Sequence, residues 1–148
     1  MAALATDAVA ALSTTQITSL TTDDVGALTA GQVSALTTSS ITAFSAAQIG
    51  NLTTAALVAL SGEQASALSS DDVAALTAPS ITALSMAAIG GLTPTNIVGM
   101  TTDAVAALTT AEISAFKVST LAALTTTQVA ALTPADSVLV ATILSGGS

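Results

Sequence analysis

Hydrophobic and polar positions recur along this chain with a period of eight residues. Seventeen consecutive octapeptides run from Leu4 to Leu139 without an insertion or a deletion. With the eight positions lettered a to h from Leu4, position a is Leu in 14 of the 17 octads. Position b is Ser or Thr in 15 of 17, and position f is Val, Ile or Leu in 15 of 17. The pattern predicts one small structural unit, repeated over residues 1–139.

Each octad has the features of a helix N-terminus. A Ser or Thr at b is a favoured N-cap residue, because its side-chain oxygen accepts a hydrogen bond from a free N–H of the first turn. Three positions later, e is often Gln, Glu, Asp or Asn, which can bond back to the N–H of the cap and complete a capping box. The apolar residues at a and f then form a hydrophobic staple. We therefore expect a short helix from position c to position h of each octad.

Acidic residues and prolines support the same assignment. All nine Asp and Glu residues lie at d or e, in the predicted first turn, where the helix dipole favours negative charge. Pro94 and Pro134 lie at c, the first helical position, which proline prefers. The predicted structural N-caps are Thr21, Thr29, Thr37, Ser45, Thr53, Ser61, Ser69, Thr77, Ser85, Thr93, Thr101, Thr109, Thr125 and Thr133. Loss of the hydroxyl at such a cap, as in Thr109→Val, is expected to destabilise the protein more than loss at the neighbouring position, as in Thr110→Val.

Helices this short are not stable alone, since isolated helices below about 12–15 residues are marginal. Stacking of neighbouring octads must supply the stability, as it does in solenoids. The predicted fold class is all-α, a solenoid of very short helices with one helix per octad. A β-solenoid is the alternative, because Thr, Val and Ile also favour strands. Positions a and f are five apart, however, and would face opposite sides of a strand, whereas f and the next a have a helical spacing of three.

The octad pattern changes near the C-terminus. Ser137 replaces the usual apolar residue at f, and the residues that follow it are mostly apolar. With Thr133 as its N-cap, a longer, divergent helix is predicted over residues 133–144, followed by a flexible tail at residues 145–148. This helix either folds back as a cap or joins a second copy head to tail, which gives an open filament. The residues expected to self-associate in the second case are Val138, Leu139, Val140, Ile143 and Leu144.

Composition removes several classes of function. The formal net charge is −8 with a single basic residue, which argues against nucleic acid as a partner. No apolar run has the 18 or more residues of a membrane span. The sequence has no His, Cys, Tyr or Trp, so most acid–base, nucleophilic and metal-ligand groups are missing. We predict that the chain is not an enzyme and has no catalytic, cofactor-binding or metal-binding residues.

Octads such as Leu12-Ser13-Thr14-Thr15-Gln16-Ile17 and Leu124-Thr125-Thr126-Thr127-Gln128-Val129 resemble a known bacterial repeat. The Leu-Thr-Thr-x-Gln-Ile/Val-x-Ala pattern is similar to the octapeptide arrays of large secreted or cell-surface proteins of adhesin type. The resemblance covers nearly the whole chain, and no functional residues carry over from it. It implies an extracellular or cell-surface stalk, spacer or fibre, although the start of the chain has no basic segment typical of a signal peptide.

The predicted function is therefore a non-catalytic structural repeat protein. It would act as an extracellular spacer or stalk, or as a self-assembling filament subunit whose partner is a second copy of itself. The alternative is a surface-binding module, such as an ice-binding or adhesin repeat. Threonine recurs at position c, and a regular solenoid can present such a row at a fixed spacing to ice or to a surface polymer.

Overall fold

The structure is a computed structural model that describes residues 5–146, so Leu4, the first residue of the array, lies outside the described part. The described residues form seventeen helices and no strand. The predicted all-α solenoid of short helices is confirmed, and the β-solenoid alternative is wrong. The helices are α1 (Thr6–Ala10), α2 (Thr14–Thr18), α3 (Thr22–Gly26), α4 (Ala30–Ala35), α5 (Thr38–Ala43), α6 (Ala46–Gly50), α7 (Thr54–Leu57), α8 (Gly62–Ser66), α9 (Ser70–Ala74), α10 (Ala78–Thr82), α11 (Met86–Gly91), α12 (Pro94–Ile97), α13 (Thr102–Ala106), α14 (Thr110–Ala115), α15 (Val118–Leu121), α16 (Thr126–Ala131) and α17 (Pro134–Gly146).

Each octad contains one helical turn or a little more, followed by a short extended link at positions a and b. Leu36 ends α4 with φ −66° and ψ 141°, and Thr37 opens α5 with φ −76° and ψ 161°. The N–H of Leu36 still donates to the carbonyl of Val33 at 3.2 Å, so the last turn closes before the chain extends. The alternation of helix and link turns the chain through a regular angle at every octad, which produces a superhelix.

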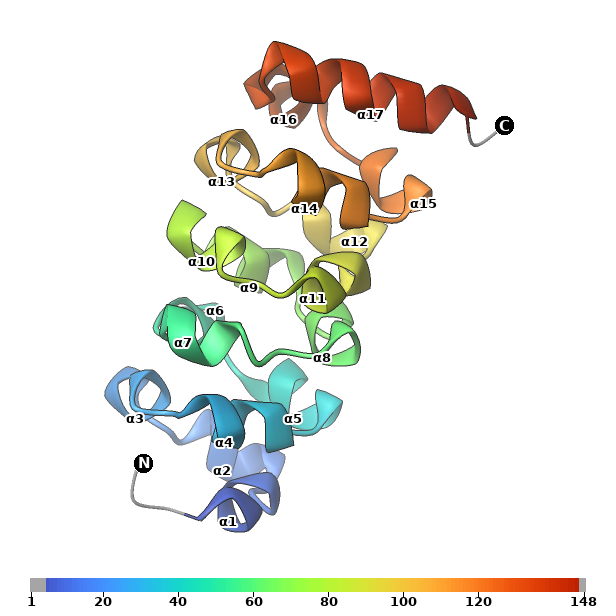
Figure 1. Cartoon of the computed structure of the whole chain (residues 1–148). Helices are drawn as coiled ribbons and strands as arrows, with labels where there is room; N and C mark the ends of the chain where they lie inside the picture. The colour runs from blue at the N-terminus through green and yellow to red at the C-terminus, as the bar shows by residue number, and fades with distance from the viewer. Residues whose placement is uncertain (1–4, 147–148) are drawn as a thin grey trace.

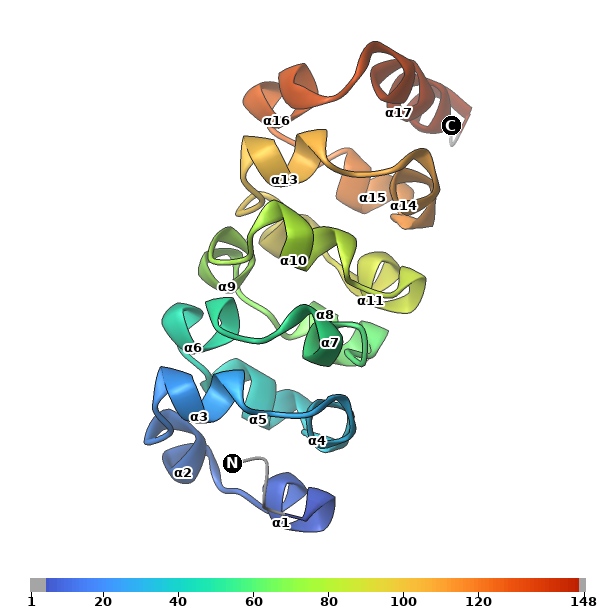
Figure 2. The same ribbon diagram turned by 60° about the vertical axis from the view of Figure 1, so that its left-hand side comes forward.

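The octads stack into successive turns of a solenoid. Each helix contacts the helix three places further along the chain, and the layers are visible as steps from α1 at one end to α16 and α17 at the other (Figure 1). The turned view in Figure 2 shows the same layers from another side. Side-chain hydrogen bonds between turns join residues from 25 to 31 positions apart. One turn therefore takes between three and four octads.

The interior of the solenoid is formed by positions a and f. The f side chains from Val9 to Leu121 are at most 2% exposed, and the a side chains from Leu28 to Phe116 are at most 6% exposed. Position f loses its burial at the C-terminal end, where Val129 is 38% exposed. Positions c, d and g face outward, mostly with small side chains. The core is thus a narrow column of aliphatic residues that extends with each added octad.

The C-terminal helix is longer than predicted, and within one chain it folds back as a cap, which is one of the two predicted arrangements. It continues to Gly146, so Ser145 and Gly146 are helical, and the last two residues of the predicted tail lie outside the described part. It also packs against α14 and α15 and caps that end of the column. Val140 is 3% exposed within the core, so its assignment to self-association is wrong.

The other four residues assigned to self-association have different environments. Leu139, Ile143 and Leu144 pack, partly buried, against the core. Val138 is 68% exposed and remains the one fully available residue of that set. The orientation of α17 explains the difference, since the helix places one side on the solenoid and turns Val138 away from it.

Candidate functional site

The predicted N-cap residues, from Thr21 to Thr133, all stand at helix N-termini with a side-chain oxygen that accepts from the N–H three residues later. Ser13, which obeys the same rule, also caps its helix. Ala5 and Lys117 make no side-chain cap. Each of these hydroxyls therefore takes part in a helix cap.

Thr110→Val is not a suitable control for Thr109→Val, because Thr110 has a contact of its own. The hydroxyl of Thr110 donates to Asp136 Oδ1 of the next turn at 3.1 Å, so neither residue is a neutral reference. Thr125 and Thr126 form a cleaner pair. Thr125 Oγ1 accepts from the N–H of Gln128 at 3.2 Å, whereas Thr126 is exposed.

We expect Thr125→Val to lower the free energy of unfolding by about 1 kcal/mol, because valine keeps the shape of threonine and removes the cap. Thr126→Val should change it by less than about 0.5 kcal/mol. Urea unfolding followed by circular dichroism measures both. Equal losses for the two variants would contradict the capping assignment.

Asp24 shows the electrostatic effect of a capping box in which the acid is accessible to solvent. The Thr21 hydroxyl and the Thr21 backbone N–H donate to Asp24 Oδ2 at 2.7 and 3.1 Å. These hydrogen bonds, the hydroxyl first, lower the pKa of Asp24 below its ordinary value. The carboxylate is therefore held in its ionised form.

The lowered pKa of Asp24 gives a pH dependence with a defined sign. A carboxyl whose pKa is lower in the folded than in the unfolded chain stabilises the fold above the unfolded value of about 4. That contribution is lost as the pH falls through the folded pKa. We expect Thr21→Val to raise the pKa of Asp24, measured by an NMR titration of its carboxyl carbon. Thr22→Val should leave the pKa of Asp24 unchanged. A pKa of Asp24 that does not respond to Thr21→Val would show that the box is not its cause.

Amides at position e have a second role that the octad pattern did not reveal. The Nε2 group of Gln64 donates to the carbonyls of Val33 and Leu36 at 2.8 and 2.7 Å, while its Oε1 accepts from the N–H of Ser61 at 2.9 Å. The side chain is only 3% exposed. One residue thus completes its own capping box and ties its turn to the turn before it.

The same tie, which we call the inter-turn clamp, recurs with a spacing of 31 and 28 residues. Gln48 donates to Ile17 and Leu20, and Gln128 donates to Ile97 and Met100. Asn96 donates to Ala65 and Leu68, and the Thr120 hydroxyl donates to Leu92. One feature of the sequence could have predicted the inter-turn clamp. Position e often holds an amide, which can donate as well as accept a hydrogen bond, rather than a carboxylate.

Three buried carboxyls occupy the same position without acting as clamps. Asp72, Glu112 and Asp136 are at most 6% exposed. Asp72 and Glu112 accept from the N–H and hydroxyl of their own caps at 2.7 to 2.8 Å, and Asp136 accepts from Thr110 of the turn before. An ionised carboxylate has no proton to donate to a carbonyl. These positions therefore complete the capping box or receive a hydrogen bond, but they do not clamp.

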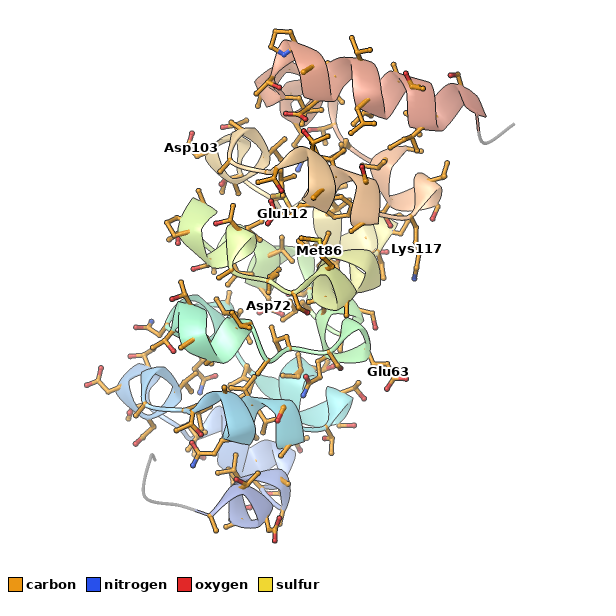
Figure 3. The ribbon with its side chains drawn as sticks, in the orientation of Figure 1. Glu63, Asp72, Met86, Asp103, Glu112 and Lys117 are labelled. Carbon is orange, nitrogen blue, oxygen red and sulfur yellow. The ribbon has the colours of Figure 1, made fainter. Side chains whose placement is uncertain are left out.

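A shallow hollow of about 330 Å³ on the surface is lined by Gly62, Glu63 and Ser66 of α8, by Ala87, Gly90 and Gly91 of α11, and by Lys117. Figure 3 shows Glu63 and Lys117 along the same edge of the solenoid, on different turns. The Ser66 hydroxyl is bonded to the carbonyl of Glu63 at 2.7 Å. The hollow therefore combines one acidic side chain, one basic side chain and a serine hydroxyl that is already hydrogen-bonded to a backbone carbonyl.

The described residues contain no group of three or more His, Cys, Asp or Glu side chains that could hold a metal ion. Every buried polar side-chain atom in the described part has a hydrogen-bond partner. Among residues 5–146, no helix is both long and apolar enough to cross a membrane. The buried amides, carboxyls and hydroxyls at position e of the described residues serve helix caps and contacts between turns.

The comparisons with known proteins place part of the chain in a repeat family. Residues 1–38 match the family model of the ALTTAQ repeat. The matched segment covers about a quarter of the chain, and the later octads keep the same residue types at a, b and f. Neither the search of the curated proteins nor the search of the solved structures found a match. The partial match and the regular fold both support a repeat-array protein.

Proposed function

We propose that this chain is a non-catalytic spacer or stalk, located outside the cell or at its surface. The observation that carries the proposal is that successive turns of the described residues stack through the same aliphatic a and f positions, with clamps at several of the contacts. Contacts of this kind add with each repeat and do not close into a globule. The number of octads then sets the length, which is the property that a spacer requires.

The distribution of polar groups supports a structural rather than a chemical role. Ser and Thr hydroxyls at b cap helices, and amides at e clamp turns. The outward positions carry small side chains, with scattered single apolar residues such as Val58 and Val98. Isolated exposed apolar residues need no ligand to explain them.

Lys117 provides a direct test of the location, because it is the single Lys or Arg of the chain and is exposed. We expect an amine reagent that cannot cross membranes to label Lys117 on intact cells that make the protein. Lys117→Gln is the control for labelling elsewhere, such as at an α-amino group. Labelling that requires lysis of the cells would contradict a surface location.

Self-assembly is a second candidate, and the exposure of the first turn favours it. Leu12 and Leu20 are only partly buried, although the a residues from Leu28 to Phe116 are at most 6% exposed. Gln16, which holds a clamp position, is exposed as well. At the other end α17 covers the column, and Val138 is its exposed apolar residue. A second copy would therefore bury the first turn of one chain against α17 of another.

Sedimentation velocity at several concentrations distinguishes these two functions. A spacer sediments as a monomer throughout, whereas a filament subunit grows with concentration. Val138→Asp should abolish growth, and Val58→Asp, which alters a similarly exposed residue in the middle of the array, should not. Growth that survives Val138→Asp would place the joint elsewhere.

The geometry offers no support for the ice-binding alternative. Helices three places apart stack on one another, and their c residues do not form a row of threonine, as Thr38 of α5 is followed by a glycine in α8 and a methionine in α11. The residues at c also differ from octad to octad, as at Gly62, Met86 and Pro94. A flat, regular threonine face is thus not formed.

A further inference from the structure

Clamps tie the turns together unequally along the chain. Gln48, Gln64, Asn96, Thr120 and Gln128 each donate from position e to carbonyls 28 to 31 residues earlier. These contacts matter because the carbonyls at f and a are buried and would otherwise lose a partner. Where clamps are missing, only apolar packing and close backbone contact hold one turn on the next.

The longest run of e positions without a clamp lies in the middle of the solenoid, at Asp72, Ser80 and Ala88. Asp72 accepts from Ser69, and the Ser80 hydroxyl is bonded to Thr77 Oγ1 at 2.9 Å. Ala88 has no polar side-chain group. From Ser40 onward, the other e positions without a clamp form shorter runs: Ser40 alone, Ala56 alone, Ala104 with Glu112, and Asp136 alone. Three successive octads are therefore not clamped to the turn below.

The 31- and 28-residue spacing identifies the carbonyls that these three positions leave without a clamp. They are those of Ile41, Phe44, Ile49, Leu52, Leu57 and Leu60. Across this contact, between residues 41–60 and residues 72–88, which we call the central seam, the structure shows one side-chain hydrogen bond, from Ser85 Oγ to the Leu60 carbonyl at 3.3 Å. Its length is beyond the usual range for O–H···O bonds.

Clamps border the central seam on both sides, at 2.7 and 2.8 Å for Gln64 and at 3.1 and 3.4 Å for Asn96. Gln64 clamps α8 to the turn below, and Asn96 clamps α12 to α8 and its link. Beside the seam, the backbones of Gly62 and Gly91 approach so closely that a Cβ at Gly91 would lie 2.5 Å from Gly62 Cα. The turns are therefore held firmly next to the central seam and more weakly within it.

We propose that the solenoid has a built-in yield point at the central seam, where its turns separate first, pivoting about the backbone contact between α8 and α11. This inference rests on the proposed spacer function and states how the spacer responds to load. Solenoid contacts join only neighbouring turns, so one contact can open while the others stay closed. Opening at the seam lengthens and bends the array without breaking the clamps on either side.

Two reciprocal substitutions test the seam. Asp72→Asn makes this position equivalent to Asn96, whose Oδ1 accepts from the cap N–H at 2.8 Å while its Nδ2 donates to the turn below. It supplies a clamp with almost no change of shape. Asn96→Asp removes the existing clamp in the same way.

Hydrogen exchange of the full chain, resolved by mass spectrometry, gives the first measurement. In the unaltered protein, amides of residues 41–60 and 72–88 should exchange about tenfold faster than those of residues 92–100, since two hydrogen bonds separate the clamped from the unclamped state. Asp72→Asn should slow amide exchange in the central seam by about the same factor. Asn96→Asp should speed exchange around Ala65 and Leu68.

The inference is overturned if amide exchange among residues 28–116 is fastest outside the central seam. It is also overturned if Asp72→Asn does not change the exchange rate of the amides in the seam. Should Asp72→Asn fail to fold, Asn96→Asp still decides, because unaltered exchange at Ala65 and Leu68 would show that clamps do not govern opening.

Pulling the full chain by its ends supplies the mechanical counterpart. We expect a first extension step that precedes the main unfolding steps and moves to higher force in Asp72→Asn. A single all-or-none step in both proteins would refute the yield point. Failure of the spacer proposal would instead appear as labelling of Lys117 only after lysis, so the two results are separable.

Discussion

Gly91→Ala is expected to lower the free energy of unfolding by about 3 kcal/mol or more. The added Cβ would overlap the carbonyl oxygen of Gly62 and lie 2.5 Å from its Cα. Both groups belong to the backbone of the adjacent turn, so no flexible side chain can move aside. The turns would have to separate between α8 and α11, and the aliphatic core beside them would open.

Gly31→Ala is the matched control, because Gly31 also lies within a helix and a Cβ there meets no atom within 4 Å. Alanine is favoured over glycine in a helix by about 1 kcal/mol, so this variant should be slightly more stable than the parent. Thermal unfolding followed by circular dichroism at 222 nm compares them. Similar melting temperatures for Gly91→Ala and Gly31→Ala would show that the close approach of α8 and α11 is absent in solution.

Gln64→Leu is expected to cost about 3 kcal/mol, through the loss of three hydrogen bonds at about 1 kcal/mol each. Leucine fills most of the space of the glutamine side chain but has no polar group, so the lost free energy comes mainly from the hydrogen bonds. The Ser61 N–H loses its acceptor, and the carbonyls of Val33 and Leu36 lose their donor. The Val33 carbonyl still accepts from the N–H of Leu36 in this variant. The Leu36 carbonyl loses the hydrogen bond that Gln64 donates to it.

Gln16→Leu separates the two roles of a glutamine at position e. Gln16 completes a capping box with Ser13 at 2.8 Å but is exposed in the first turn, so its loss should cost about 1 kcal/mol or less.

Glu112→Gln makes the opposite change by supplying a donor toward Ile81 and Leu84, and it should raise the unfolding free energy by about 1 kcal/mol. Urea unfolding curves measure all three variants. If Gln64→Leu cost no more than Gln16→Leu, the clamps would contribute nothing measurable.

The C-terminal helix illustrates how far an apolar pattern can be interpreted. The run from Val138 to Leu144 predicted either a cap or a joint, and both require apolar residues. Which side of that helix meets the solenoid depends on how α17 lies across α14 and α15. Burial of Val140 and exposure of Val138, two residues apart, could therefore not be assigned from composition.

The clamps show a similar division. The presence of Gln64 at e predicted a capping box, because the cap N–H lies three residues away along the same chain. Its second set of partners lies 28 and 31 residues away, and no local rule connects them. Only the number of octads per turn brings that amide to those carbonyls.

The sequence by itself determined where each helix starts and which residues cap it, since capping, dipole and staple interactions all act within five residues. It likewise determined that a and f form the core, because their spacing places them on one side of a short helix. The tertiary structure alone decided how many octads make a turn, which carbonyls the amides at e reach, and where Gly62 and Gly91 meet. Those features depend on the small angle added at every octad, and such angles accumulate over a whole turn before distant residues come into contact.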